Sequence, residues 1–201
     1  MDEKLTSPRC AIFNTDAIIH DQTLCSEGDP IKIYYVCPYR PLKSWPHNQR
    51  GENTKMILAL QDNKDPGRPV AVDYFFGELD KVLSNQFPIA MVPSHDPQAA
   101  PAGIVQLIQR LVANNRIDAA SCLVRHTKVE ESSYWKNRSM EKHLSSIKVM
   151  NRTLVEKQTV LLLDDVVSSG NSMRACKKLL IDHGAAGVVC LTLGLRELSR
   201  R

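Results

Sequence analysis

The sequence predicts an α/β fold in which a doubly wound parallel sheet carries helices on both faces. Short apolar strand patterns alternate with segments of helical spacing over most of the 201-residue chain. Residues 160–163 form a continuous apolar run, which is typical of a strand buried on both faces. This length suits one well-covered domain but not two ordinary ones. We therefore expect a small flanking or cap region at residues 1–85 and the core at 86–201.

Local patterns predict the individual elements in order. Residues 1–30 are of mixed polarity and predict an irregular or hairpin-forming lead-in. β-branched and aromatic residues predict a strand at 31–37, which Pro38 is expected to end. Further strands are expected at 89–92, 119–124, from 159, and at 188–193. Helices are expected at 52–61, 70–83, 102–112 and 171–183, the last one capped by Gly184.

Composition excludes several functional classes. The formal net charge of +4 suits an anionic small ligand, but it is smaller than the positive charge typical of nucleic-acid-binding domains. No apolar run approaches the roughly 18–20 residues of a membrane span, and the first residues lack a signal-peptide pattern, so we expect a cytoplasmic protein without membrane contact. The six cysteines form no CxxC pair, which argues against zinc. Cys122, Cys176 and Cys190 are expected to be buried structural thiols.

The segment 160–172 carries the most informative chemistry. Asp164 and Asp165 follow the buried strand, at the end where open parallel sheets bind their ligands. The next residues offer hydroxyls and backbone NH groups at the expected start of a helix, which favours an anion. These residues are Ser168, Ser169, Gly170, Asn171 and Ser172. A bare Asp pair is more often a solvated turn or a helix cap, but the whole string predicts a sugar-phosphate site.

Residues 160–173 resemble the 5-phosphoribosyl 1-pyrophosphate (PRPP) motif of type I phosphoribosyltransferases, with Ser at three positions where the family usually has Thr. The resemblance implies a type I phosphoribosyltransferase-like fold. It also implies that Asp164 and Asp165 hold the ribose hydroxyls, while Val167 and residues 168–172 wrap the 5'-phosphate. Mg²⁺ is expected as cofactor, carried by substrate oxygens and held indirectly by the two Asp residues.

The resemblance extends to a leaving-group site and a lid. In the family a loop after the first core strand binds pyrophosphate, and here Ser94 and His95 occupy it, although His95 could equally be an ordinary exposed histidine. Arg125 and Lys128 are placed to neutralise the leaving group as catalytic residues, with a solvated strand end as the alternative. Residues 129–146 resemble the mobile lid. Its candidate ligand-covering residues are Tyr134, Trp135 and Arg138, and the aromatic pair could instead anchor the loop or a dimer interface.

The order of elements from about Ile33 to Leu195 most resembles ComF-like phosphoribosyltransferase-domain proteins, which are associated with bacterial competence. Those proteins typically begin with a paired-Cys zinc finger, whereas Cys10, Cys25 and Cys37 are widely spaced here. Purine-salvage members usually carry an acidic residue soon after the Gly turn. Residues 171–180 contain none, which argues against hypoxanthine or guanine as the acceptor.

Two functions remain open from the sequence. The first is a PRPP-dependent transferase of nucleotide metabolism that moves phosphoribose to an unidentified nitrogen nucleophile. The second is an inactive PRPP- or nucleotide-sensing module whose lid reports the ligand to a partner protein or a nucleic acid. Basic residues in and before the lid favour catalysis, whereas a pyrophosphate loop without Gly or Lys favours sensing. The sequence leaves the acceptor, a homodimer and a nucleic-acid partner undecided.

Overall fold

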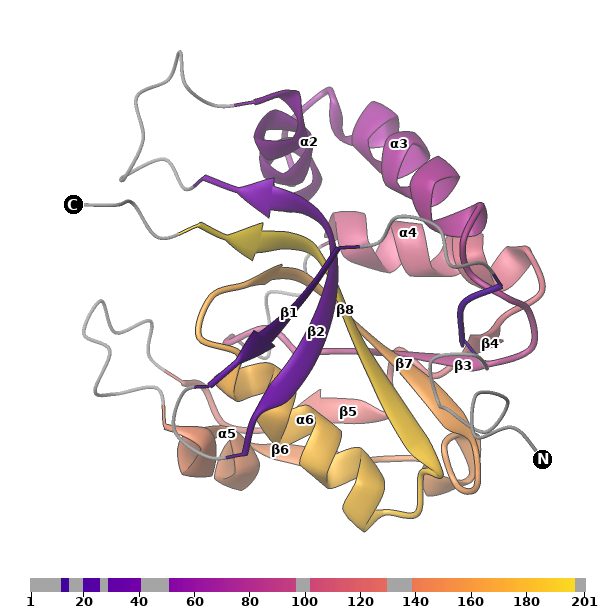
Figure 1. Cartoon of the computed structure of the whole chain (residues 1–201), viewed down its shortest axis with the longest axis vertical. Coiled ribbons are helices and arrows are strands. Elements are labelled where there is room, and N and C mark those ends of the chain that lie inside the picture. The colour runs from indigo at the N-terminus through magenta and orange to yellow at the C-terminus, as the bar shows by residue number, and fades with distance from the viewer. Residues whose placement is uncertain are drawn as a thin grey trace.

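The computed structural model describes residues 12–14, 20–25, 29–40, 51–96, 102–129 and 139–197. Its centre is a six-stranded sheet in the order β1-β2-β8-β7-β3-β4 (Figure 1). All neighbouring strands are parallel except β1, which pairs antiparallel with β2. The strands are β1 (His20–Leu24), β2 (Ile31–Tyr39), β3 (Pro88–Met91), β4 (Ile117–Asp118), β7 (Thr159–Val167) and β8 (Gly187–Arg196). The predicted α/β class with a mostly parallel sheet is therefore confirmed.

Helices cover both faces of this sheet (Figure 1). One face carries α2 (Glu52–Gln61), α3 (Arg68–Asp80) and α4 (Ala102–Ala113). The other carries α6 (Asn171–Asp182) and the short α5 (Met140–Ser146). A separate antiparallel pair, β5 (Leu123–Arg125) and β6 (Ile147–Val149), lies on the α5 side, followed by the 3-10 helix η4 (Arg152–Leu154). These layers give the molecule two hydrophobic cores.

Strand β7 shows why the sheet has to be covered on both sides. Leu161 and Leu163 belong to the core beneath α2, α3 and α4, whereas Val160 and Leu162 belong to the core beneath α6. All four side chains are fully buried. Successive side chains of a strand point to opposite faces, so the continuous apolar run fills both cores.

Several element predictions hold and two need correction. Helices α2, α3, α4 and α6 lie where the helical spacing predicted them. The strand predicted at 119–124 is wrong, because the chain leaves the main sheet after Asp118 and forms β5 beside β6 instead. Strand β2 also continues through Pro38 to Tyr39. Within the part of the chain that the structure describes, β1 pairs only with residues 31–35, so Pro38 lies beyond the segment of β2 that β1 covers, where a missing NH is more readily tolerated.

The N-terminal part contributes directly to the main sheet. β2 pairs with β8 from Ile33 to Tyr39, and β1 forms the predicted hairpin with β2. The division into residues 1–85 and 86–201 stays a prediction. The main sheet itself contains strands from both sides of that division.

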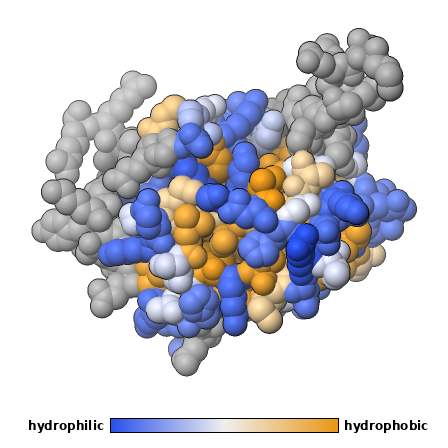
Figure 2. Space-filling model, turned by 90° about the horizontal axis from the view of Figure 1, so that it is seen from below, coloured by the Kyte–Doolittle hydropathy of each residue, from blue (hydrophilic) through white to orange (hydrophobic). Residues whose placement is uncertain are grey.

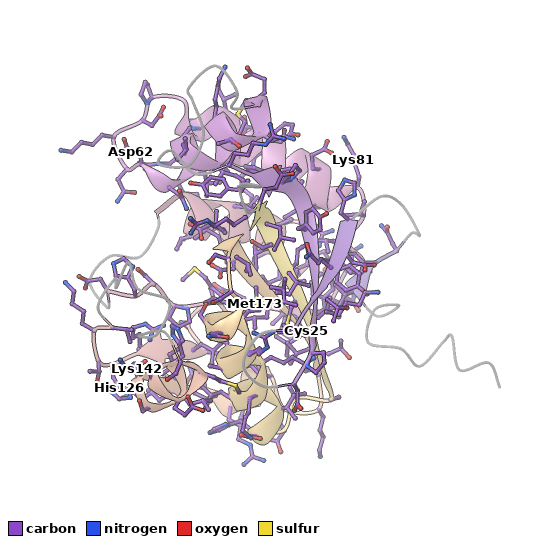
Figure 3. All side chains as sticks on the ribbon, turned by 60° about the vertical axis from the view of Figure 1, so that its left-hand side comes forward. Cys25, Asp62, Lys81, His126, Lys142 and Met173 are labelled. Atoms are coloured by element: carbon purple, nitrogen blue, oxygen red, sulfur yellow. The ribbon has the colours of Figure 1, made fainter. Side chains whose placement is uncertain are left out.

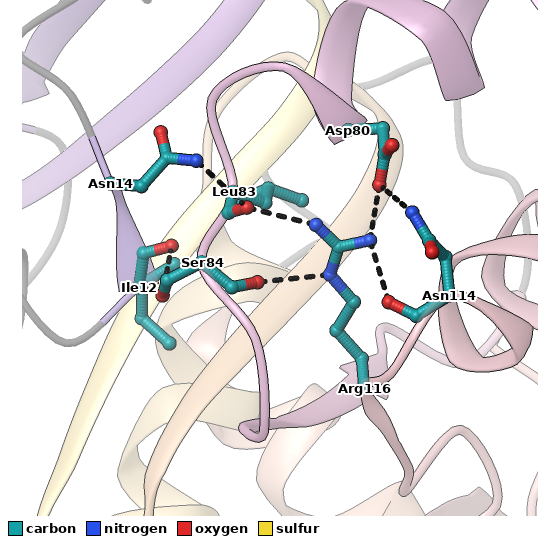
Figure 4. A network of polar contacts seen from close by, with 7 residues as sticks. All are labelled: Ile12, Asn14, Asp80, Leu83, Ser84, Asn114 and Arg116. Carbon is teal, nitrogen blue, oxygen red and sulfur yellow. Dashed lines mark hydrogen bonds and ion pairs between the residues drawn. The ribbon is translucent and has the colours of Figure 1, made fainter.

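A buried arginine organises the amino edge of the sheet, away from the carboxyl edge where ligands bind in such folds (Figure 4). Arg116 is 6% exposed and donates to the carbonyls of Leu83 and Ser84 at 2.8 and 2.9 Å. It also pairs with Asp80, which accepts a further bond from Asn114. Burial acts to raise the pKa of Asp80, but these two donors outweigh it and lower that pKa. The network is therefore structural.

The buried cysteines are structural as predicted. Cys122, Cys176 and Cys190 are at most 1% exposed, and burial raises the pKa of Cys122 and Cys190 to about 12. These groups therefore remain thiols at neutral pH.

The surface gives little indication of a partner. Seen from below Figure 1, from the side where α6, β5 and β6 lie, hydrophobic side chains show between hydrophilic ones (Figure 2). Exposed large apolar residues on these and adjoining segments include Val124, Met150 and Ile181. Such single residues are common on protein surfaces. Among the described helices, none combines the length and apolarity needed to cross a lipid bilayer.

Candidate functional site

The Asp pair, the serine turn and the loop 93–96 lie at the carboxyl edge of β7 and β3. These strands pair in parallel with Met91 opposite Leu163, and the NH of Val92 donates to the carbonyl of Leu163 at 3.0 Å. The loop 93–96 therefore begins beside the position where Asp164 follows Leu163. The topology brings together two segments that lie about seventy residues apart in the sequence, as the parallel-sheet prediction required.

Asp164 and Asp165 lie within β7 rather than after it, because the strand continues past the apolar run 160–163 to Val167. Both are half-buried. The Asp164 Oδ1 atom accepts the NH of Asp165 at 3.0 Å, and the Asp165 Oδ1 atom accepts the NH of Val166 at 2.7 Å. Burial and the neighbouring charge of Asp165 raise the pKa of Asp164 well above its usual value.

Neither carboxylate has a cationic partner among the side chains that the structure describes. An uncompensated acidic pair is unfavourable in the ligand-free protein, and it is suited to hydroxyl donors or a cation brought by a ligand. The described residues also contain no cluster of three or more potential metal-ligating His, Cys, Asp or Glu side chains. The two Asp residues offer oxygen ligands of the type that Mg²⁺ prefers, but too few for an all-protein cage.

A glutamine on α2 reaches this acidic pair. The Gln61 Nε2 atom donates to the Asp165 Oδ2 atom at 2.8 Å. The two residues lie 104 positions apart, so no local pattern could have predicted the contact. Gln61 is the last residue of its helix and was missed as a site residue in the sequence.

The serine-rich turn connects β7 to α6 as predicted. Gly170 has φ +80° and precedes the first helical residue, Asn171. The left-handed conformation favours glycine, and a Cβ there would also lie 3.1 Å from the Leu24 Cδ1 atom. Ser168, Ser169 and Ser172 are half-buried, while Val167 is buried. Because the first NH groups of a helix lack intrahelical acceptors, this turn can bind an anion.

A second buried arginine holds this turn from beneath. Arg174 is 4% exposed and donates to main-chain carbonyls of the serine turn and of the residues that flank the β1–β2 connection. The acceptors are Ser169 O at 3.0 Å, Asp29 O at 3.1 Å and Leu24 O at 2.5 Å, with Asn171 Oδ1 at 3.1 Å. Burial lowers the pKa of the guanidinium, which nevertheless stays charged in proteins. The β1–β2 connection is thereby tied to the candidate phosphate turn.

The predicted pyrophosphate residues also lie together. The NH of Val129 donates to the carbonyl of His95 at 3.1 Å, which joins the segment after β5 to the loop 93–96. The Lys128 Nζ atom lies 2.8 Å from the Asp96 Oδ2 atom, and this bond raises the pKa of Lys128. Ser94 is half-buried and His95 is exposed. The loop and the basic strand end form one surface.

Arg125 differs from Lys128 in being buried, with 4% exposure. Its Nε atom donates to Ser94 O and its Nη1 atom donates to Ser146 Oγ, both at 2.5 Å. Its Nη2 atom lies 3.4 Å from the Nδ1 atom of His143. Arg125 therefore links the loop 93–96 to α5, and the supporting residues Ser146 and His143 were not predicted.

The lid prediction falls largely outside the described residues. Tyr134, Trp135 and Arg138 lie in 130–138, and their roles stay predictions. After this segment the chain forms α5, whose last residue Ser146 accepts the NH of His126 at 3.0 Å. Lys142 and His126 are labelled in the lower part of Figure 3, and Asp62 in the upper part. Asp62 directly follows Gln61, so it marks the end of α2, which lies on the opposite face of the sheet from α5 and α6.

The site geometry agrees with a comparison to protein-family models. Residues 104–198 match the model described as phosphoribosyl transferase domain. This match supports the type I phosphoribosyltransferase family. The matched segment contains the Asp pair, the serine turn, Arg125 and Lys128, but not Ser94, His95 or Gln61. A comparison with curated proteins gave no match. The ComF-like subtype stays a prediction.

Proposed function

We propose that this protein is a PRPP-dependent phosphoribosyltransferase that moves phosphoribose to a nitrogen nucleophile and releases pyrophosphate. Phosphoribosyl transfer in general is supported by the match of residues 104–198. The observation that carries the proposal is the carboxyl edge of the adjacent strands β3 and β7. There an acidic pair with no cationic partner among the described side chains and the N-terminus of α6 follow β7, and the Lys128–Asp96 pair lies at the loop after β3. These three features suit the ribose, the 5'-phosphate and the leaving group of PRPP.

The donor half of the site has separate roles for its residues. Asp164 and Asp165 accept hydrogen bonds from the ribose 2'- and 3'-hydroxyls. The backbone NH groups and side chains of 168–172 bind the 5'-phosphate at the start of α6, with Val167 packing beneath the turn. This division follows from the chemistry, because hydroxyls donate to carboxylates and phosphate accepts from NH groups.

The leaving-group half consists of the loop 93–96 and the segment after β5. Ser94 and His95 face the leaving pyrophosphate, and Lys128 exchanges Asp96 for a pyrophosphate oxygen. Arg125 contributes chiefly by fixing the loop, because its guanidinium is occupied by Ser94 and Ser146. Tyr134, Trp135 and Arg138 are proposed to cover the ligand from the lid.

The residues present fit Mg²⁺ that arrives with the substrate, since the two carboxylates supply oxygen atoms and no described side chain pairs with them as a cation. When bound, Mg²⁺ would neutralise charge on the departing pyrophosphate. In the transfer, the nitrogen forms a bond to the anomeric carbon while the bond from that carbon to the pyrophosphate oxygen breaks. Asp164 and Asp165 hold the ribose as positive charge develops on it while that bond breaks, and the nitrogen then releases its proton to solvent.

The test is pyrophosphate release from PRPP and Mg²⁺ in the presence of a panel of nitrogen bases. We expect release that depends on one base or a small group of related bases, and none with the Asp164→Asn, Asp165→Asn double variant. Release from wild type that is independent of every base would indicate hydrolysis rather than transfer and would contradict the proposal.

One observation favours the alternative of a PRPP- or nucleotide-sensing module. Both cations expected at the leaving group are already engaged within the protein, Arg125 by Ser94 and Ser146 and Lys128 by Asp96. The same assay separates the two functions. Tight PRPP binding without pyrophosphate release under any base would favour the sensor.

A further inference from the structure

A side chain of the α2 helix, Gln61, reaches the candidate ribose site. The two oxygens of Asp165 each accept one hydrogen bond, Oδ1 from the NH of Val166 at 2.7 Å and Oδ2 from the Gln61 amide at 2.8 Å. A carboxylate can accept about four hydrogen bonds, so each oxygen keeps a further acceptor direction. The two bonds fix the rotation of the carboxyl group, and hence where those remaining directions point.

The end of α2 is held firmly enough to act as a support. Ile57 and Leu60 are fully buried against the sheet, and the NH of Asp62 closes the last turn on Leu58 O at 3.0 Å. Gly103 of α4 approaches the same turn so closely that a Cβ there would lie 2.2 Å from the Leu60 carbonyl oxygen. Gln61 therefore projects from a fixed backbone, while its own side chain is half-buried and borders the surface.

We propose that Gln61 is a positioning residue of the donor site, whose amide holds the Asp165 carboxylate in the orientation that accepts the ribose hydroxyls. The inference rests on the proposed function. Two adjacent carboxylates repel each other, and without the Gln61 amide only the NH of Val166 would hold the Asp165 carboxylate against rotation away from Asp164. The Gln61 amide offsets this tendency without adding a charge that would compete with the ligand.

The proposal assigns part of the donor site to the N-terminal part of the chain. Gln61 lies before the matched residues 104–198, and it belongs to the helix layer on the opposite face from α6. The ribose would therefore be held from both layers of the fold, with Asp165 between them. Because α2 contacts the Asp165 carboxylate that binds the ribose, the position of this helix would directly affect the affinity for PRPP.

Two nearly isosteric variants of the full chain test the proposal. Gln61→Met removes the donor and keeps the length, whereas Gln61→Glu replaces the donor with a second acceptor beside Asp165. Gln106→Met serves as the matched control, because Gln106 is an exposed glutamine within α4. The readouts are the dissociation constants for ribose 5-phosphate with Mg²⁺ and for inorganic pyrophosphate, together with Tm.

We expect Gln61→Met to weaken ribose 5-phosphate binding about tenfold, the loss that corresponds to one hydrogen bond to a charged group. Gln61→Glu should weaken it further, because it adds repulsion. Pyrophosphate affinity should stay as in the control, because pyrophosphate has no hydroxyls for Asp165, and Tm shows that each variant is folded at the temperature of the titration. Unchanged or tighter ribose 5-phosphate binding in Gln61→Met would overturn the inference, and so would an equal loss for both ligands. Wild-type protein that does not bind ribose 5-phosphate would instead refute the proposed function.

Discussion

Replacing Asp164 and Asp165 together with Asn is expected to abolish the rise in Tm that PRPP with Mg²⁺ gives the wild-type chain. At a ligand concentration of about 100 times Kd, binding stabilises a protein by about 2.7 kcal/mol. For a chain of about 200 residues this corresponds to a rise in Tm of about 5–10 °C. Asn keeps the size of the side chains but cannot accept the ribose hydroxyls as a carboxylate does, so the rise should disappear.

Replacing Asp164 alone with Asn is expected to stabilise the ligand-free protein at neutral pH. Burial and Asp165 raise the pKa of Asp164 above its unfolded value, so the folded state loses stability as the pH rises from the unfolded pKa through the folded one. At neutral pH the single variant Asp164→Asn removes this penalty. We expect its Tm to rise by about 2–4 °C, the shift that about 1 kcal/mol produces in a chain of this size. Binding would thus be lost while stability is gained.

Thermal unfolding with and without PRPP and Mg²⁺ measures both effects. Asp118→Asn is the matched control, because Asp118 is an exposed aspartate at the end of another strand of the same sheet. The control should keep the ligand-induced rise. A double variant that still responds to PRPP would contradict the assigned role, and a lower ligand-free Tm for Asp164→Asn would contradict the electrostatic account.

Replacing Arg174 with Met is expected to cause the second large effect. The change leaves the carbonyls of Leu24, Asp29 and Ser169 without their buried donor, and each unsatisfied group costs about 1–3 kcal/mol. We expect a loss of about 3 kcal/mol in the free energy of unfolding, since partial relaxation and water entry offset some of this cost. PRPP affinity should fall as well, because the turn at Gly170 loses its support.

Denaturant unfolding and PRPP titration of the folded variant measure the two consequences separately. Arg174→Lys keeps the charge but lacks the planar fork, so its losses should be intermediate. Lys178→Met, an exposed site on the same helix, is the control and should change stability by less than about 1 kcal/mol. If Arg174→Met is as stable as this control, Arg174 does not hold the turn.

The sequence predicted the parts of the fold that have a clear local pattern. The buried run before Asp164 and the helical spacing of α2, α3, α4 and α6 correspond to elements of the structure. The apolar run 119–124 was ambiguous, because burial against the sheet and burial against β6 require the same residue types. The side chain of Cys122 fills the second core while the chain leaves the main sheet, and periodicity does not distinguish these cases.

For the site residues too, the sequence predicted only what has a local pattern. Asp164, Asp165 and the serine turn form a contiguous motif, so the sequence could name them. Gln61 contacts Asp165 across two layers, and Arg174 reaches back to Leu24 and Asp29. Such long-range hydrogen bonds follow from packing and leave no local signature. An arginine on the buried side of an amphipathic helix was the one available signal for Arg174.

The most direct test of the central claim is a crystal structure of the protein with ribose 5-phosphate and Mg²⁺. The predicted result places the phosphate within hydrogen-bond distance of the backbone of 168–172, with the ribose hydroxyls on Asp164 and Asp165. A ligand bound elsewhere, or a phosphate at the turn with the sugar directed away from the Asp pair, would contradict the assignment of this edge as a phosphoribose site.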